Sequence, residues 1–589
     1  MMPWPATTLH PAVPALAAFV LSLALAACAD DTTNAPTFSD TGVDAGSDAQ
    51  LDTAADAIVD VQPDLPPDDD GAQPPDHPAQ HFPDTFLASP TVRVDLMRVP
   101  GFEVPPNPVS GAPSPQAANV TTVFRYRREV EPPAPVRAIL VMMPGFLGGA
   151  GSVDGLATAL VERGQAEGHP VEVWAIDRRS NGLEDLRGMD TAELAGDPEI
   201  AAGYYLGGHT VDGAAFGGFV NGRSASWMSE WGLQTHVEDL RRVIARVPAE
   251  QRRAHVFLVG HSLGAAFAEL YGAWRFEDGV RGSEELAGLV LLDGALGGTP
   301  LDEAAYDGGA SGGPFPTPGV TAIRGGSVTT ELPLLGVSVY VIAEILALRT
   351  LQAPDDVVAD PARDNLLQIL MGVQAPAMSN AAALGFGFDD AFCPLPFARL
   401  KMGEATGGPV ESYTSFLSMQ PQQRPTDPAS TYTWIDAAEA SEYTPIADFA
   451  EGMARGPGNF AEWYFPARLS LDISASAGAN LPDDGWQAAR GLRAFDGELD
   501  DAPVLAVAGG LVSVQAISAV SDRVAPVVGE GRPQAGRTRQ DPEGFRVVDA
   551  TDLAHIDVVM APDGPANPIP AAILDFVDLH AVEGTVASP

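Results

Sequence analysis

The sequence predicts an α/β protein with a central, mostly parallel sheet and one large, mainly helical insertion. Short apolar strands alternate with helical patterns from about residue 136 to residue 293, and again after residue 503. This alternation favours a parallel sheet. Between the two parts the alternation stops for about 200 residues, which is too long for a loop. A third observation is a sharp, glycine-flanked turn between a strand and a helix at residues 260–264.

Length and charge set the first limits on function. At 589 residues the chain is longer than one ordinary domain, so a core with accessory segments is expected. The formal net charge of −45 argues against nucleic-acid binding, because affinity for phosphate needs clustered Lys and Arg side chains.

Residues 1–28 have the pattern of a signal peptide. Pro11–Ala27 is almost wholly apolar but short for a membrane span. It runs into Leu25-Ala26-Ala27-Cys28, which resembles the lipobox of bacterial lipoproteins. The resemblance implies export, lipidation of Cys28 and a lipid anchor in a bacterial membrane, and we expect the outer membrane. Residues 1–10 lack Lys and Arg, so an ordinary secretory signal is the alternative. Cys393 is the only other cysteine, so no disulfide is expected in the mature chain.

Residues 29–90 are predicted to form a disordered, aspartate-rich linker. They contain no Lys, Arg or Glu, and aspartate recurs at every fourth position from Asp40 to Asp68. On a helix this spacing would stack like charges. A self-repelling tether is therefore the interpretation, with weak calcium binding as the alternative.

The first part of the core is expected at residues 91–300. Thr91–Met97 and Val120–Arg127 alternate between apolar and polar residues, which indicates early, largely antiparallel strands. Val136–Met143 and Val171–Ile176 are nearly continuous apolar runs, as expected for strands buried on both faces. Leu233–Val247 carries its apolar residues on one face and predicts an amphipathic helix before the next strand.

Residues 255–266 predict a strand, a sharp turn and a helix. The turn reads Gly-His-Ser-Leu-Gly, and Gly260 and Gly264 remove side chains that would clash there. Ser262 is left at the apex, and the helix that follows brings N–H groups close to its hydroxyl. This arrangement resembles the nucleophile elbow of the α/β-hydrolase superfamily, whose members include serine esterases and lipases.

The resemblance implies an α/β-hydrolase fold with Ser262 as the nucleophile. It also implies a second oxyanion-hole amide in the turn Pro144–Gly149, after the strand Val136–Met143. We assign the two backbone N–H groups to Phe146 and Leu263, with a plain glycine-rich turn as the alternative. The loop Asp177–Gly182 is similar to the one that borders the site in this superfamily.

Residues 301–500, after the strand Leu289–Leu292, are expected to form a cap insertion. Helical apolar stretches occur at Val337–Leu348 and Asn365–Met371, amid loops rich in Pro and Gly. Caps at this place in related hydrolases cover the serine and shape the substrate pocket. Three phenylalanines either line an acyl pocket or belong to the core of the cap: Phe386, Phe388 and Phe392.

The second part of the core is expected at residues 501–589. Pro503–Ala508 and Phe545–Val548 are its strands, and His555 follows the second of them. The context of His555, with Asp557 two residues later, resembles the catalytic-histidine loop of the superfamily. His555 is therefore the predicted general base.

Two aspartates are candidates for the acid that orients the histidine. In the superfamily this acid usually follows the strand that corresponds to Pro503–Ala508, but no carboxylate is at hand there. The residues around Asp522 resemble those around the usual acid, but Asp522 follows the strand only after a long insertion. Asp293 ends the strand Leu289–Leu292, a position that some related hydrolases use. Because rigid placement orients a histidine best, we favour Asp293 and keep Asp522 as the alternative.

These residues predict a serine hydrolase that cleaves carboxylic esters, with lipid-like esters as an expected class. Amide or thioester cleavage would use the same triad, and no cofactor or metal is implied. A catalytically silent α/β-hydrolase fold that binds ligands at the cell surface is the alternative from another class. The sequence leaves the oligomeric state open.

Overall fold

The computed structural model describes residues 82–310, 317–330, 332, 335–436, 441–495 and 501–587. The predicted signal peptide, Cys28 and the aspartate repeat lie outside these residues. The folded part begins earlier than the sequence predicts, because β1 (Thr85–Ser89) lies within the predicted linker. Its residues pair antiparallel with β2 (Val92–Pro100), with Phe86 opposite Val94, so that β2 gains a second neighbour.

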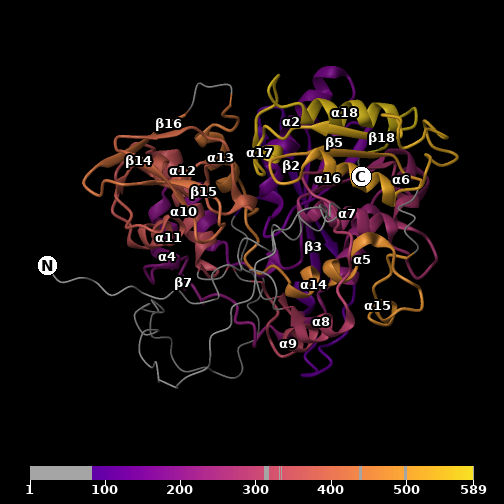
Figure 1. The fold of residues 1–589 in the computed structure, drawn as a ribbon, viewed down its shortest axis with the longest axis horizontal. Helices are drawn as coiled ribbons and strands as arrows, with labels where there is room; N and C mark the ends of the chain where they lie inside the picture. The colour runs from indigo at the N-terminus through magenta and orange to yellow at the C-terminus, as the bar shows by residue number, and fades with distance from the viewer. Residues whose placement is uncertain are drawn as a thin grey trace, which may run out of the picture.

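A nine-stranded sheet forms the centre of the core lobe, at the right of Figure 1, in the order β1-β2-β3-β5-β4-β8-β9-β17-β18. β1, β2, β3 and β5 pair antiparallel in succession, and all later neighbours are parallel. This is the sheet of an α/β-hydrolase fold, so the predicted fold class is confirmed. The strands not yet bounded are β3 (Val120–Arg128), β4 (Ala138–Met143), β5 (Val171–Asp177), β8 (Val256–His261), β9 (Gly288–Leu292), β17 (Val504–Ala508) and β18 (Phe545–Asp549).

Helices cover both faces of this sheet. All residues of β4 are buried, and alternate side chains enter different cores. Ile139 and Val141 belong to the hydrophobic cluster with α5 and α7, whereas Leu140 and Met142 belong to the one with α2 and α18. The covering helices are α2 (Asp154–Glu167), α5 (Leu233–Ile244), α7 (Leu263–Ala273) and α18 (Ile569–His580).

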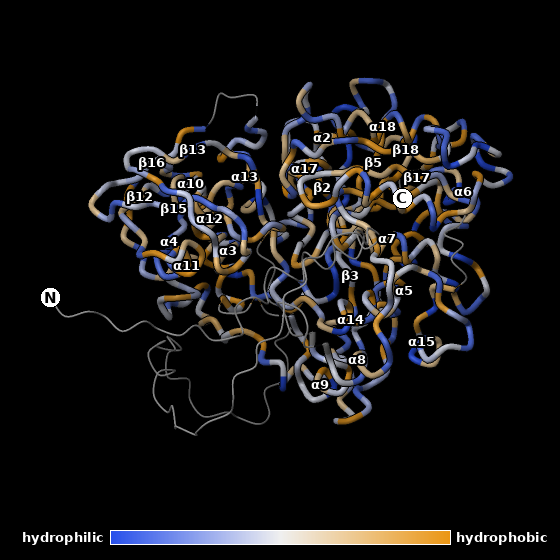
Figure 2. Tube along the Cα trace, viewed as in Figure 1, coloured by the Kyte–Doolittle hydropathy of each residue, from blue (hydrophilic) through white to orange (hydrophobic). Residues whose placement is uncertain are grey.

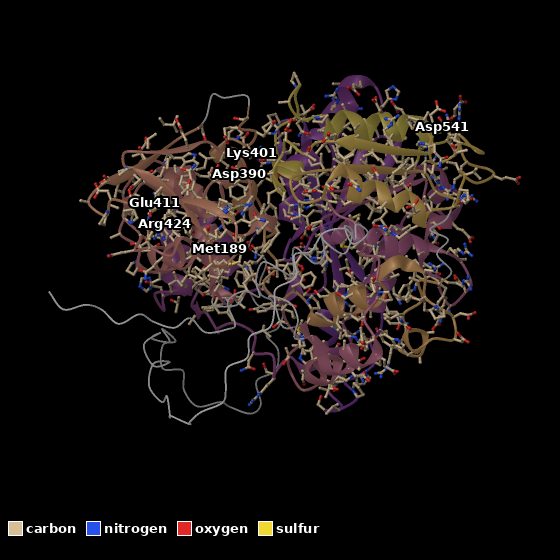
Figure 3. All side chains as sticks on the ribbon, in the orientation of Figure 1. Met189, Asp390, Lys401, Glu411, Arg424 and Asp541 are labelled. Atoms are coloured by element: carbon tan, nitrogen blue, oxygen red, sulfur yellow. The ribbon has the colours of Figure 1, made fainter. Side chains whose placement is uncertain are left out.

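The chain between β9 and β17 builds most of a second body, the cap lobe, at the left of Figure 1. Two small sheets, β12-β16-β13 and β14-β15, accompany its helices. In Figure 3 the labelled Glu411 and Arg424 mark the β14–β15 hairpin, where their side chains pair at 2.9 Å. The elements are α10 (Ser338–Gln352), α11 (Pro361–Met371), α12 (Asn380–Phe388), α13 (Ile446–Ala454), β12 (Ala377–Met378), β13 (Glu404–Thr406), β14 (Val410–Thr414), β15 (Pro421–Pro425) and β16 (Thr431–Ile435).

The cap lobe does not coincide with residues 301–500. α3 (Arg187–Ala195) and α4 (Pro198–Tyr205) come before the elbow in sequence, yet both pack against α10, and Figure 3 labels Met189 of α3 within the cap lobe. Conversely, α14 (Ala467–Ala475) packs against α5 and α7 of the core lobe. The difference arises because α3 and α4 bury apolar side chains, such as Met189 and Tyr204, that need a partner surface.

The remaining elements are short. Hydrophobic residues run through both lobes in Figure 2, which agrees with two packed interiors. Within the described residues, no helix has both the length and the hydropathy to cross a bilayer. The short elements are α6 (Ala249–His255), α8 (Glu303–Gly308), α9 (Val320–Arg324), α15 (Trp486–Ala489), α16 (Val514–Ser518), α17 (Asp557–Met560), β6 (Thr210–Val211), β7 (Ala214–Ala215), β10 (Gly309–Ala310) and β11 (Thr317–Pro318).

Candidate active site

Ser262 lies in the sharp turn between β8 and α7. Its backbone has φ 56° and ψ −123°, a conformation that costs free energy in a residue other than glycine and is typical of functional turns. Neighbouring backbone fixes the turn, since the Ser262 N–H donates to the Leu292 carbonyl at 2.9 Å. A Cβ on Gly260 would lie 2.1 Å from the Gly264 carbonyl oxygen, and one on Gly294 would lie 2.1 Å from that of Ser262. Glycine is therefore required at both positions.

His555 follows β18 and is almost fully buried. Its Nδ1 lies 2.6 Å from Oδ2 of Asp293. Its ring stacks on that of His261, with centroids 4.5 Å apart, and Nε2 of His261 lies 3.1 Å from the His555 carbonyl oxygen. A carbonyl only accepts, so His261 Nε2 must carry the proton. Burial lowers the pKa of His261 well below its ordinary value, and the nearby His555 lowers it further, so His261 packs there as a neutral ring.

Asp293 directly follows β9 and is fully buried. Backbone N–H groups after β17 donate to its carboxylate: those of Gly509 at 3.0 Å, Leu511 at 3.0 Å and Val512 at 2.7 Å. A Cβ on Gly509 would lie 2.6 Å from Cγ of Asp293, so the loop closes tightly around the carboxylate. The loop after β17, which starts without a carboxylate, thus supplies the backbone N–H groups that hold Asp293 against His555.

Asp522, the alternative acid, lies elsewhere. It is exposed in a short 3-10 helix, Ala519–Arg523. The neighbouring Arg523 turns inward and pairs with the buried Glu269 at 2.8 Å. The structure therefore brings Asp293 and not Asp522 to the histidine.

The predicted oxyanion turn lies against the serine. A Cβ on Gly145 would be 2.8 Å from Cβ of Ser262, so the backbone of this turn passes directly beside the elbow. Phe146 follows, and its ring packs edge-on against that of Phe465 at 4.9 Å between centroids. Leu263, the other predicted donor, is the first residue of α7. Both predicted residues thus lie beside Ser262. Phe146 belongs to the turn after β4, and Leu263 is the next residue in the chain.

Sequence reasoning missed the side chain that fastens this turn. Arg178, directly after β5, is buried and donates to the carbonyls of Pro144, Gly145 at 3.0 Å and Gly148 at 3.1 Å. It also pairs with the buried Glu462 at 2.6 Å. The position of Arg178 in the predicted border loop was its only sequence signal.

Glu462 adds a second set of contacts from a distant segment. Its backbone N–H donates to the Leu147 carbonyl at 2.8 Å, and the Ser180 hydroxyl donates to its carboxylate. Burial raises the pKa of Asp177, the residue before Arg178, to about 7, and the charge of Glu462 adds to this rise. A hydrogen bond from the Ala150 N–H to the Asp177 carboxylate, 2.6 Å long, opposes it. The turn is thus held by Arg178, which follows β5, and by Glu462 from a distant segment.

A cavity of about 130 Å³ joins this site to the cap lobe. Ser262, His555 and Phe146 line its core-lobe side. Of the three phenylalanines in question, Phe388 lines it, whereas Phe386 and Phe392 pack together in the interior of the cap lobe. The other cap-lobe residues of the wall include Val339, Tyr340, Ala343, Glu344, Leu346, Arg363, Leu366, Leu367, Leu370 and Met453. In the described part of the chain, no group of three or more His, Cys, Asp or Glu side chains is placed to hold a metal ion.

Comparison with known proteins adds structural likeness alone. No family model matches the chain, and no curated protein matches its sequence. Among solved structures it is similar to a protein from Sulfolobus solfataricus provisionally described as a lipase (12% identity, 84% of this chain and 95% of that chain, TM-score 0.39). It is also similar to a peroxisomal α/β-hydrolase from Saccharomyces cerevisiae (10%, 83% and 90%, 0.33) and to a thermophilic esterase from Thermogutta terrifontis (10%, 82% and 98%, 0.30). TM-scores this low give no information about activity. The evidence for the α/β-hydrolase fold is the strand order of the sheet and the sharp turn at Ser262.

Proposed function

We propose that the protein is a serine hydrolase that cleaves carboxylic esters through an acyl-enzyme. The observation that supports this most is the 2.6 Å contact between His555 Nδ1 and Asp293, beside a serine in the strained elbow conformation. Ser262 and His555 line the same cavity, so an ester there can meet both.

In this mechanism the three side chains act in sequence. The Asp293 carboxylate accepts a hydrogen bond from Nδ1–H, which keeps the proton on Nδ1 and leaves Nε2 of His555 free to act as the general base. Nε2 takes the proton of the Ser262 hydroxyl as its oxygen attacks the ester carbonyl carbon. The imidazolium then returns this proton to the departing alcohol, and a water repeats the two steps to release the acid.

The negative charge of each tetrahedral intermediate needs fixed donors. The backbone N–H groups of Phe146 and Leu263 are the proposed pair, since both residues flank Ser262. Donors of this kind are worth about 10²- to 10³-fold each in kcat. Their value depends on rigidity, which the contacts of Arg178 support.

The cavity favours esters with an apolar acyl chain. Leu, Phe, Val, Met and Ala side chains make up most of its wall in the cap lobe, and burial of each CH₂ there contributes about 0.8 kcal/mol. A lipid-like ester fits this wall. Thioesters and amides remain alternative substrates, because the same groups would act on them.

Replacement of Ser262 by alanine tests the proposal. We expect Ser262→Ala to lower the hydrolysis of p-nitrophenyl butyrate by several orders of magnitude and to abolish labelling by a fluorophosphonate. Ser152→Ala is the matched control, because Ser152 lines the same cavity but donates to the Gly149 carbonyl. If the wild-type protein neither hydrolyses esters, thioesters or amides nor takes the label, the fold serves binding instead.

A further inference from the structure

The cap-lobe wall of the cavity contains one carboxyl group with an unusual environment. Glu344 lies on α10, on the face that also presents Val339, Tyr340 and Ala343 to the cavity. Only 5% of Glu344 is exposed. Burial and the charge of Asp190 act on its carboxyl group, and no hydrogen bond to it is found among the described residues.

The second charged side chain of the cap-lobe wall, Arg363, is engaged through two of its three guanidinium nitrogens, and its Nη1 has no hydrogen-bond partner among the described residues. The guanidinium of Arg363 donates to Asp364 at 2.7 Å and to the Val358 carbonyl at 2.9 Å. Glu344 is therefore the acidic side chain of this wall, and no hydrogen bond is found at its carboxyl group among the described residues. A buried polar group without a partner destabilises the fold, and a ligand group that enters the cavity and bonds to it would recover that free energy.

We propose that Glu344 forms a specificity subsite that binds a hydroxyl group carried by the acyl chain of the ester. This inference rests on the proposed function and names its substrate class: esters of hydroxylated, otherwise apolar acids. The acyl chain extends from Ser262 along the apolar wall, and its hydroxyl meets the carboxyl of Glu344. A plain acyl chain would leave that carboxyl unpaired, and the enzyme would bind it less well.

The surroundings of Glu344 favour a neutral partner. Burial raises the pKa of Glu344 well above its ordinary value, and the nearby Asp190 adds to the shift. Glu193 faces it from α3, and burial together with the charge of Glu344 raises the pKa of Glu193 in the same way. A neutral carboxyl both donates and accepts a hydrogen bond, and a hydroxyl can answer both. An ammonium group would have to leave its water shell for a largely hydrocarbon wall.

Paired substrates test the subsite. The kcat/KM of p-nitrophenyl octanoate is compared with that of p-nitrophenyl hydroxyoctanoates that carry the hydroxyl at successive carbons, and with an aminooctanoate. We expect the wild-type protein to favour at least one hydroxy ester over octanoate by about tenfold or more. In Glu344→Leu the ratio should fall to about one, with turnover of octanoate kept or raised. Glu344→Gln should keep part of the preference, because an amide also donates and accepts.

Glu193→Gln is the matched control. Glu193 is a half-buried neighbour of Glu344 that does not line the cavity, so its replacement should leave the preference unchanged. The subsite is wrong if no hydroxy ester is preferred, if Glu344→Leu keeps the preference, or if the aminooctanoate is the favoured substrate. In each of these cases Ser262-dependent hydrolysis of octanoate shows that the proposed function stands. If no ester is hydrolysed, the proposed function fails, and the subsite fails with it.

Discussion

Asp293 and His555 meet through a 2.6 Å contact between Oδ2 and Nδ1, although one follows β9 and the other follows β18. β17 lies between these two strands in the sheet. The loop after β17 carries no carboxylate at its start and instead donates the N–H groups of Gly509, Leu511 and Val512 to Asp293. The acid thus reaches across one strand, and the loop it passes holds it in place.

Replacement of the acid should disable the histidine. We expect Asp293→Asn to lower kcat on p-nitrophenyl butyrate by about three to four orders of magnitude at neutral pH. An asparagine amide facing Nδ1 would favour the tautomer whose Nε2 is protonated, and that nitrogen could not accept the serine proton. Steady-state kinetics with active-site titration would measure the loss.

Asp522→Asn is the comparison for this experiment. Asp522 is exposed, so its replacement should cost about tenfold or less. A crippled Asp522→Asn protein beside an active Asp293→Asn protein would move the acid to residue 522. Ser262 and His555 would keep their proposed roles in that case.

Arg178 should affect the transition state more than substrate binding. Arg178→Lys keeps the charge but cannot reach the carbonyls of Pro144, Gly145 and Gly148 and the Glu462 carboxylate together. We expect kcat to fall by about tenfold to a hundredfold with KM nearly unchanged. Affinity for a trifluoromethyl ketone, which forms an oxyanion on Ser262, should fall in parallel.

Arg179→Lys serves as the control for that experiment. Arg179 is equally buried, but it pairs with Asp239 at 2.8 Å and donates to the Phe102 carbonyl, away from the turn. Loss of stability without loss of ketone affinity is the expected result for Arg179→Lys. The same pattern in Arg178→Lys would show that Arg178 is structural only.

The parts of the site that depend on local chain geometry could be predicted from the sequence. Gly260 and Gly264 flank Ser262 within five positions, and Asp293 directly follows a strand, so neighbours alone indicate their placement. The pairing of Arg178 with Glu462 spans 284 positions, and no local pattern reports it. Glu344 lies in a helix where a carboxylate usually marks the solvent face, and only the packing of the cap lobe makes it a wall residue. The sequence likewise predicts a core that includes residues 187–205, because chain order does not reveal that α3 and α4 are buried in the cap lobe.

Lipidation of Cys28 stays a prediction from the sequence, and cell fractionation can test it. In a bacterial host, Cys28→Ala should move the protein from the membrane fraction to the soluble fraction, because stable anchoring needs several acyl chains. Cys393→Ala is the matched control. Cys393 is buried in the cap lobe, and burial raises the pKa of its thiol to about 11, so it should take no lipid. An unmodified Cys28 in the mature protein, found by mass spectrometry, would contradict the prediction.

The stability of the protein should fall as pH rises from about 5 to about 8, because buried carboxyls such as that of Asp389 are protonated in the fold and ionised in the unfolded chain. Burial raises the pKa of Asp389 to about 8 from an ordinary 3.8, with the charges of Asp390 and Glu442 adding to the shift. Between these two pKa values the folded chain holds a proton that the unfolded chain has lost, so unfolding becomes easier as pH rises, by about 1.4 kcal/mol per unit for one group. Asp389→Asn imitates the protonated carboxyl and should flatten the fall of Tm between about pH 5 and pH 8. Asp427→Asn should keep the wild-type slope, because hydrogen bonds from the Ala429 N–H and the Ser430 hydroxyl lower the pKa of Asp427, which is ionised throughout this range. A wild-type slope in Asp389→Asn would show that Asp389 is already ionised in the fold.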